Sequence, residues 1–151
     1  MEVSNKADYA FHAMLYVAAM GNQHLCTINE IAEQERIPRE YLAKILKELV
    51  GKGYLKSYKG IHGGYKLAKP ASDISFLSII EAMDGPFSII SCTSPNHAKE
   101  GNLKRQKCAG YSFWGPLQDK LRDSFKEMTL DKIDFAKFYP VSKERARATA
   151  R

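Results

Sequence analysis

Apolar residues recur at helical spacing in the first third of the chain. In residues 4–20 they lie three and four positions apart, as on one face of a helix (Ala7, Ala10, Phe11, Met14, Leu15 and Ala18). Gly21 is the predicted end of this helix. Thr27 and Glu30 stand in the order of a capping box, in which each side chain accepts a hydrogen bond from the other residue's backbone amide. This pattern predicts a second, short helix from Ile28 to about Gln34.

A third helix and a hairpin are predicted next. Pro38 suits the start of a helix, and residues 39–50 carry a single apolar stripe (Leu42, Ile45, Leu46 and Leu49). Two short alternating segments, 54–58 and 65–68, flank the glycine-rich connection 60–64, which is typical of a β-hairpin. This order of elements predicts a winged helix-turn-helix domain in residues 1–70. In that fold the third helix enters a DNA major groove, and the hairpin, or wing, lies on the adjacent backbone or minor groove.

The second half of the chain predicts a connecting helix, a long loop and a long helix. Ser75 caps a short apolar segment within residues 71–86, and residues 87–111 have no helical period, which favours a functional loop. In residues 112–139, an apolar stripe predicts a helix that packs against a second copy of the chain (Trp114, Leu117, Leu121, Phe125 and Met128). Thr129 is predicted to open a short packing helix after it. Residues 140–151 are basic and predict a disordered tail. The predicted fold is therefore mainly α with a small β-hairpin, a winged helix-turn-helix domain plus a long C-terminal dimerisation helix.

The distribution of basic residues along the chain indicates a class of binding partner. The chain has 151 residues and a formal net charge of +6. Residues 39–69, the predicted third helix and hairpin, hold eight basic residues against two acidic ones, while residues 99–107 and 143–151 each carry a net charge of +3. A basic excess confined to one helix and one hairpin favours nucleic acid as the partner. A winged-helix module that binds protein is the competing class, and this local excess argues against it.

Several other classes are excluded. Apolar residues make up 44% of the chain, which is enough for a folded core, but no run of about 18 apolar residues predicts a membrane span. Residues 1–6 lack the pattern of a signal peptide, so we expect a cytoplasmic protein. No nucleophile–base set, phosphate-binding loop or dinucleotide fingerprint is present, so we expect neither an enzyme nor a small-molecule substrate.

Specific motifs of the chain resemble a known family. They are the run Tyr41-Leu42, Lys44-Ile45-Leu46 and Leu49, the run Gly60-Ile61-His62-Gly63-Gly64-Tyr65-Lys66-Leu67-Ala68, and the segment from Trp114 to Leu130. In this order they resemble the IscR/NsrR/CymR-type family of bacterial winged-helix transcription regulators. The resemblance covers the chain up to about Phe138. It implies a homodimer, built on the long helix, that binds an imperfect palindromic operator in double-stranded DNA and represses or activates promoters.

The DNA-binding candidates lie on the third helix and the wing. Arg39, Glu40, Tyr41 and Lys44 at the start of the helix are expected to face the groove, where arginine can grip guanine and lysine or tyrosine can contact phosphates. Lys47 extends this basic face. By resemblance, the basic residue before the wing glycines enters the minor groove, and Lys59 holds that position. His62 at the wing tip is expected to form a turn or contact a phosphate.

Two of the three cysteines are candidate cluster ligands. The resemblance implies an iron–sulfur cluster held by three cysteines in the loop before the long helix. This chain has the first and the last of them, Cys92 and Cys108, and lacks the middle one, which argues against a [4Fe–4S] cluster with three thiolates. Asp8 and His12, four residues apart on the first helix, are candidates to complete a [2Fe–2S] cluster, because the resemblance places the partner subunit's first helix near the loop. His97, within the loop, is the alternative nitrogen ligand.

Simpler interpretations of the same residues stay open. His12 can be an interface histidine and Asp8 a salt-bridge partner. Cys92 and Cys108 can form a reversible disulfide in a basic loop, or belong to a cluster-free member that senses a small molecule or a partner protein. Cys26 is expected to be a small buried hydrophobe.

Overall fold

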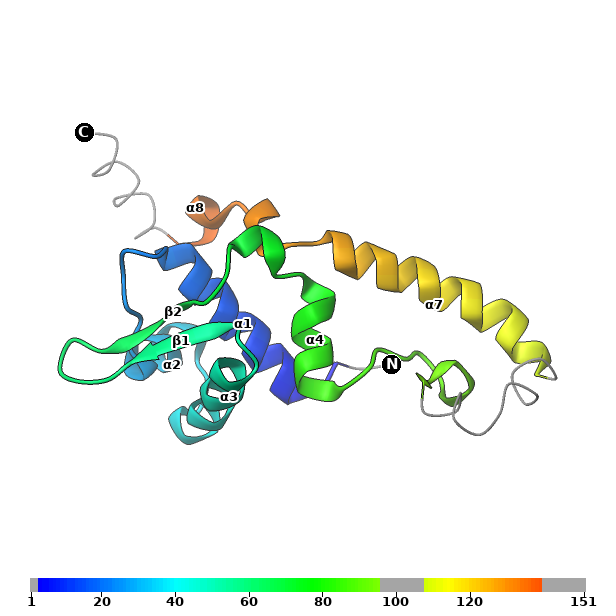
Figure 1. Cartoon of the computed structure of the whole chain (residues 1–151), viewed down its shortest axis with the longest axis horizontal. Coiled ribbons are helices and arrows are strands. Elements are labelled where there is room, and N and C mark those ends of the chain that lie inside the picture. The colour runs from blue at the N-terminus through cyan, green and yellow to red at the C-terminus, as the bar shows by residue number, and fades with distance from the viewer. Residues whose placement is uncertain (1–2, 96–107, 140–151) are drawn as a thin grey trace.

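Helices dominate the structure, and one small hairpin accompanies them (Figure 1). The computed structural model describes residues 3–95 and 108–139. Its elements in chain order are α1 (Asn5–Met20), α2 (Ile28–Glu35), α3 (Arg39–Gly51), β1 (Leu55–Tyr58), β2 (Gly64–Leu67), the 3-10 turn η1 (Ala71–Asp73), α4 (Phe76–Asp84), the 3-10 turn η2 (Ser91–Thr93), α7 (Ala109–Glu127), the 3-10 turn η3 (Leu130–Lys132) and α8 (Phe135–Phe138). The predicted fold class, mainly α with a small β-hairpin and a long C-terminal helix, is confirmed, whereas the role of that helix in dimerisation stays a prediction. His97, the basic residues 99–107 and the tail 140–151 lie outside the described residues.

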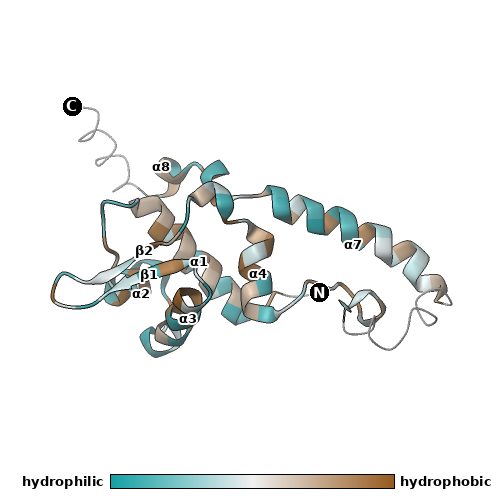
Figure 2. Ribbon diagram, in the orientation of Figure 1, coloured by the Kyte–Doolittle hydropathy of each residue, from teal (hydrophilic) through white to brown (hydrophobic). Residues whose placement is uncertain are grey.

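The core of the N-terminal domain is built around α1. This helix contacts α2, α3 and α4, and its inward side is lined by small and apolar residues that are fully buried, among them Ala10 and Met14. The stripe predicted on α3 is buried against it (Leu42, Ile45, Leu46 and Leu49). Brown hydrophobic segments therefore gather where α1, α3 and α4 meet, while the hairpin alternates pale, teal and brown segments (Figure 2).

The capping box predicted at the start of α2 is present. The Glu30 amide donates to the Thr27 hydroxyl (3.2 Å), and the Thr27 amide donates to the Glu30 carboxylate (3.3 Å). Glu30 also accepts hydrogen bonds from Tyr16 Oη (2.7 Å) and from His24 Nε2 (2.6 Å). Burial raises the pKa of Glu30, but these hydrogen bonds outweigh it and leave the pKa below its usual value.

The wing is tied to the helical core by a short third segment. β1 and β2 pair antiparallel, with Leu55 opposite Leu67 and Tyr58 opposite Gly64. Cys26 forms a further bridge to Tyr65, in which each amide donates to the other carbonyl (2.9 and 2.8 Å). A Cβ added at Gly64, whose φ is +156°, would lie 2.7 Å from the Cys26 carbonyl oxygen. Glycine here allows the hairpin to approach the segment that leads into α2.

The wing turn leaves no room for a side chain at Gly63, which gives a first testable prediction. A Cβ at this position would lie 2.1 Å from the Tyr58 carbonyl oxygen, so Gly63→Ala must displace the turn that carries Lys59 and His62. We expect DNA affinity to fall at least about tenfold, because wing cations moved from their positions would lose the phosphate contacts that the sequence predicts for them. Fluorescence anisotropy with operator DNA measures this. The matched control is Gly51→Ala, since a Cβ there meets nothing within 4 Å; equal affinity of the two variants would contradict the prediction.

α7 extends away from the helical core and is anchored at its C-terminal end (Figure 1). The Phe76 amide donates to the Met128 carbonyl (2.8 Å), and the Leu130 amide donates to the Ile74 carbonyl (3.0 Å). These bonds hold Leu130 beside the start of α4, so residues 130–138 form η3 and α8 and not the single short helix that we predicted. α7 also begins at Ala109, before the range 112–139 assigned to it. No helix in residues 3–95 or 108–139 is long and apolar enough to cross a membrane.

Candidate nucleic-acid interface and sensor site

The predicted reading residues all lie on exposed faces of α3 and the wing. Because the apolar stripe of α3 is buried against α1, the remaining faces of the helix turn outward. Arg39 Nε donates to Asn29 Oδ1 (2.6 Å), which links the first turn of α3 to the first turn of α2. The exposed set comprises Arg39, Glu40, Tyr41, Lys44, Lys47, Lys59 and His62. The fold therefore presents a helix face and a hairpin tip that together carry four lysine or arginine side chains, one histidine, one tyrosine and one glutamate.

Contacts from α1 fix the orientation of α3. The Tyr9 and Tyr41 rings meet edge to face, with centroids 5.7 Å apart. Lys6 Nζ lies 2.7 Å from Glu48 Oε2, and this hydrogen-bonded ion pair holds the pKa of Glu48 below its usual value. Tyr41 is thus partly engaged by α1, while Arg39, Lys44 and Lys47 stay exposed.

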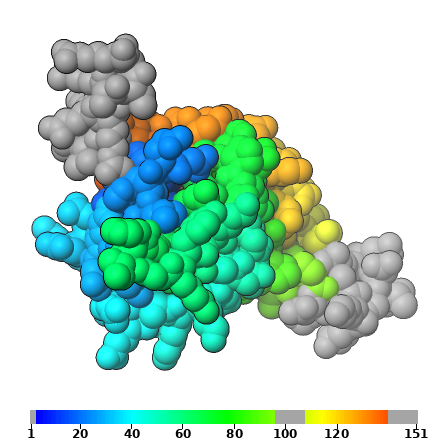
Figure 3. Space-filling model, turned by 60° about the vertical axis from the view of Figure 1, so that its left-hand side comes forward, coloured from blue at the N-terminus to red at the C-terminus, as the bar shows by residue number. Residues whose placement is uncertain are grey.

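The wing carries its charge at and behind an exposed tip. Lys59 and His62 stand in the turn between β1 and β2, and Ile61 between them is 97% exposed. Lys66 Nζ lies over the Tyr58 ring, 4.9 Å from its centroid. Figure 3 shows side chains of the hairpin and of the neighbouring α2–α3 region projecting on the same side of the domain. Ile61 was not among the predicted DNA-binding residues, although an isoleucine inside a polar turn could have indicated an exposed contact residue at the wing tip.

Cys92 and Cys108 both lie in the part of the molecule around the start of α7. Cys92 is half-buried in η2, and Cys108 is the exposed residue that precedes α7. The buried Gln118 of α7 fixes the η2 segment: its Oε1 accepts from the Ile89 amide (2.9 Å), and its Nε2 donates to the Thr93 carbonyl (3.2 Å). The segment that carries Cys92 is therefore coupled to α7 by hydrogen bonds between the Gln118 side chain and the backbone on either side of Cys92. Gln118 was missed at the sequence level because a single polar residue in an amphipathic helix gives no local sign of burial.

Asp8 and His12 lie together on α1. His12 Nε2 is 3.6 Å from Asp8 Oδ1, and His12 Nδ1 is 3.2 Å from Glu35 Oε2. Tyr139 Oη donates to the other oxygen of Glu35 (2.8 Å), and burial, followed by this contact with Glu35, raises the pKa of Tyr139 well above its usual value. His12 lines a cavity of about 500 Å³ between α1, α2 and the C-terminal segment. Glu35 was not predicted, because it is 23 residues from His12 in the sequence.

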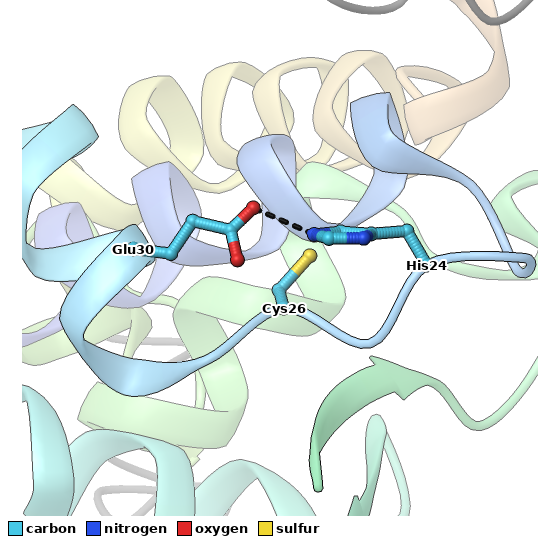
Figure 4. A group of neighbouring side chains, drawn as sticks. All are labelled: His24, Cys26 and Glu30. Atoms are coloured by element: carbon cyan, nitrogen blue, oxygen red, sulfur yellow. Dashed lines mark hydrogen bonds and ion pairs between the residues drawn. The ribbon is translucent and has the colours of Figure 1, made fainter. Parts of the chain in front are cut away.

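Within one protomer the four candidate ligands form two separate pairs. Asp8 and His12 lie on α1, whereas Cys92 and Cys108 lie with α7, and α4 stands between the two helices (Figure 1). Cys26 is fully buried, as expected, but it also lies beside His24 and Glu30 (Figure 4). The spacing of these three residues, two and four positions apart on a loop and a first helical turn, was a signal that the sequence interpretation left unused.

The apolar stripe of α7 is only partly covered by the rest of the chain. Phe125 packs within its own protomer, edge to face against Phe76 and Phe87. Three other apolar side chains stay open to solvent, with Phe113 66%, Met128 60% and Leu117 36% exposed. Trp114 and Leu121 are half-buried between these two groups. Phe113 was not among the predicted interface residues, because it precedes the regular spacing by one position.

Known proteins share both the sequence and this architecture. A 146-residue alignment with an HTH-type transcriptional regulator of Aquifex aeolicus gives 32% identity and covers 95% of this chain and all of the relative. The HTH-type transcriptional regulator IscR of Pectobacterium carotovorum is 29% identical over 88% of this chain and 79% of its own length. The structure of CymR, the global cysteine regulator of Bacillus subtilis, shares the fold, with a TM-score of 0.69, 22% identity and coverage of 91% of this chain and 98% of that chain.

The family assignment rests on nearly the whole described chain. The Rrf2 model, described as an iron-dependent transcriptional regulator, matches residues 3–134. The relatives and the fold are those of transcription regulators and not of enzymes. The winged-helix domain, the segment of Cys92 and the long helix all fall within this match, so the chain belongs to the Rrf2 family of transcriptional regulators.

Proposed function

We propose that this chain is a homodimeric DNA-binding transcription regulator whose operator affinity is controlled by a [2Fe–2S] cluster. The observation that carries the DNA-binding part is the exposed basic face of α3 together with the cationic wing. Neutralised phosphates supply most of the affinity of such a surface, and Arg39 is the side chain best suited to grip a guanine in the major groove. The operator is then a palindrome, because two copies of one reading surface are related by a twofold axis.

Dimerisation is supported by the open apolar face of α7. Phe113, Leu117 and Met128 form an exposed patch on a helix that extends away from the core. Exposed apolar patches of this kind on a helix mark contact surfaces. A second copy of α7, packed along Leu117 and the neighbouring Trp114 and Leu121, would cover it.

The chemistry of the donor set fits a cluster shared between two subunits. Cys92 and Cys108 offer two thiolates, and Asp8 with His12 offers a carboxylate and an imidazole. The Nδ1 of His12 faces Glu35, which leaves Nε2 on the side of Asp8. A metal-binding histidine commonly donates its other ring N–H to a carboxylate, which fixes the tautomer and the ring orientation. Glu35 is placed to do this for His12.

The two pairs of ligands would come from different protomers. Because α4 separates them within one protomer, the thiolates of one chain would meet Asp8 and His12 of its partner. A bound [2Fe–2S] cluster supplies a one-electron redox change and a change of net charge at this junction. Gln118 would transmit a movement of the Cys92 segment to α7, and the ion pair of Arg122 with Glu81 extends the connection to α4.

A thiol switch is the second candidate, and one observation favours it. Cys108 is exposed and Cys92 is only half-buried, so neither cysteine belongs to the buried core. In this alternative the two thiols form a reversible disulfide, and the protein carries no iron. Anaerobic purification distinguishes regulation by a cluster from regulation by a thiol switch.

The predicted outcome of anaerobic purification is a coloured protein. We expect visible absorption, two irons and two sulfides per cluster site, and loss of the absorption in Cys92→Ala, which removes a thiolate. His12→Ala should change the spectrum or reduce the iron content, while Lys137→Ala, an exposed change on α8, should leave both unchanged. A colourless preparation without iron, together with a disulfide detected by mass spectrometry after oxidation, would replace the cluster with the thiol switch.

A further inference from the structure

The connection between α1 and α2 brings together three different metal-binding side chains. His24 lies in the turn after α1, Cys26 lies in the bridge to the wing, and Glu30 lies in the first turn of α2. Their ligand atoms, an imidazole nitrogen, a sulfur and a carboxylate oxygen, all lie within 4.8 Å of one another. Figure 4 shows the three side chains pointing toward a common centre.

The spacing and chemistry of these atoms match a small transition-metal site. Zinc is bound by thiolate sulfur at about 2.3 Å and by imidazole nitrogen or carboxylate oxygen at about 2.0 Å, so tetrahedral ligands stand roughly 3.3 to 3.8 Å apart. His24 Nε2 and Glu30 Oε1 are 2.6 Å apart as a hydrogen-bonded pair. Moving these two atoms about 0.7 Å further apart would bring them to the ligand spacing of a zinc site.

The surroundings orient the ligands and leave a path for the ion. Tyr16 Oη and the Thr27 amide both donate to Glu30 and hold its carboxylate in place. Hydrogen bonds to a ligating group from a neighbouring side chain are typical of metal centres. The side chains of His24 and Glu30 are 27% and 28% exposed, whereas Cys26 is fully buried. Two of the three side chains thus reach solvent, and a water molecule would complete a four-coordinate site.

We propose that His24, Cys26 and Glu30 bind one divalent transition-metal ion, with Zn²⁺ as the best fit to this donor set. The site is separate from Cys92 and Cys108 and lies within a single protomer. On binding, the Cys26 thiol loses its proton to solvent and its sulfur becomes a ligand.

The site is coupled to the wing through the backbone. Cys26 exchanges two hydrogen bonds with Tyr65 of β2, and Gly64 lies against the Cys26 carbonyl. An ion that joins His24, Cys26 and Glu30 would fix this bridge to the start of α2. The bound metal would thereby hold the wing in one position relative to the reading helix.

A cobalt titration tests the site directly. The untagged full-length chain carrying Cys92→Ser and Cys108→Ser retains Cys26 as its single cysteine. We expect one Co²⁺ per chain, a thiolate-to-cobalt charge-transfer band in the near ultraviolet, and displacement of Co²⁺ by Zn²⁺. Cys26→Ser in this background should abolish the band, and His24→Gln should weaken binding at least about tenfold. Glu33→Gln, on the exposed side of α2, is the control and should bind as the parent does.

Clear outcomes overturn the proposal. No charge-transfer band in the parent, or a band that survives in Cys26→Ser, would contradict the site. His24→Gln changes a partly exposed residue, so it tests the site even where substitution of the buried Cys26 unfolds the chain, and unchanged Co²⁺ affinity in this variant would also contradict it. In hydrogen exchange, Zn²⁺ should slow the amides of Cys26 and Tyr65 at least about tenfold; equal rates with and without Zn²⁺ would overturn the coupling to the wing.

Discussion

Replacing Arg39 and Lys59 together by alanine should reduce operator affinity at least about 100-fold. In the proposed dimer the variant loses two candidate guanine contacts, worth about 1–3 kcal/mol each, and two candidate cationic contacts of the wing. Both side chains are exposed, and among the described residues the hydrogen bond to Asn29 is the contact that Arg39 gives up. We therefore expect the fold and the dimer to persist. Gel-shift titration at fixed salt measures the affinity, and sedimentation checks the dimer.

The control for this variant removes the same charge elsewhere. Lys126→Ala and Lys137→Ala together take two exposed lysines from α7 and α8, so the net charge falls by the same amount. We expect their operator affinity to stay within about threefold of the parent. If both double variants bind equally well, the basic face of α3 and the wing does not read DNA.

Introducing a charge on the open face of α7 should separate the dimer. Leu117→Glu places a carboxylate in the centre of the exposed apolar patch, and the twofold axis brings two such groups into one interface. Burial of an unpaired charge costs several kcal/mol, so the dissociation constant of the dimer should rise at least about 100-fold. Sedimentation velocity across micromolar concentrations measures this change, and operator affinity should fall with it.

The matched control lies on the opposite side of the same helix. Lys126→Gln also lowers the net charge by one unit. Lys126 is exposed, and nine residues at about 100° per residue place it on the side of the helix opposite Leu117. This control should remain dimeric. A Leu117→Glu protein that sediments as the parent does would show that α7 is not the interface, and the exposed patch would then need another partner.

The local parts of the fold could be predicted from the sequence. The capping box of Thr27 with Glu30, the buried stripe of α3 and the hairpin around Gly60–Gly64 depend on residues close together in the chain, so spacing alone identifies them. The same holds for Ser75 as the cap of α4. These elements fix the exposed positions of Arg39 and Lys59, and they explain why the DNA-binding candidates could be named before the structure was known.

The contacts between distant segments could not be predicted in the same way. The bridge of Cys26 to Tyr65, the contact of Glu35 with His12 and the hydrogen bonds of Gln118 to the Cys92 segment all join residues far apart in the chain. Such contacts depend on how α1, α4 and α7 pack, and one sequence does not report that packing. They orient His12 beside Asp8, fix the segment that carries Cys92, and place Cys26 beside the wing.

A DNA selection followed by footprinting tests the central claim most directly. The purified full-length protein is incubated with a random double-stranded library, and the enriched sequence is then examined by protection from cleavage. Two reading helices related by a twofold axis predict an inverted repeat whose half-sites lie about one helical turn, or a multiple of it, apart on one face of the duplex. Enrichment of no sequence, or of a single half-site without symmetry, would contradict a homodimer that reads DNA through α3 and the wing.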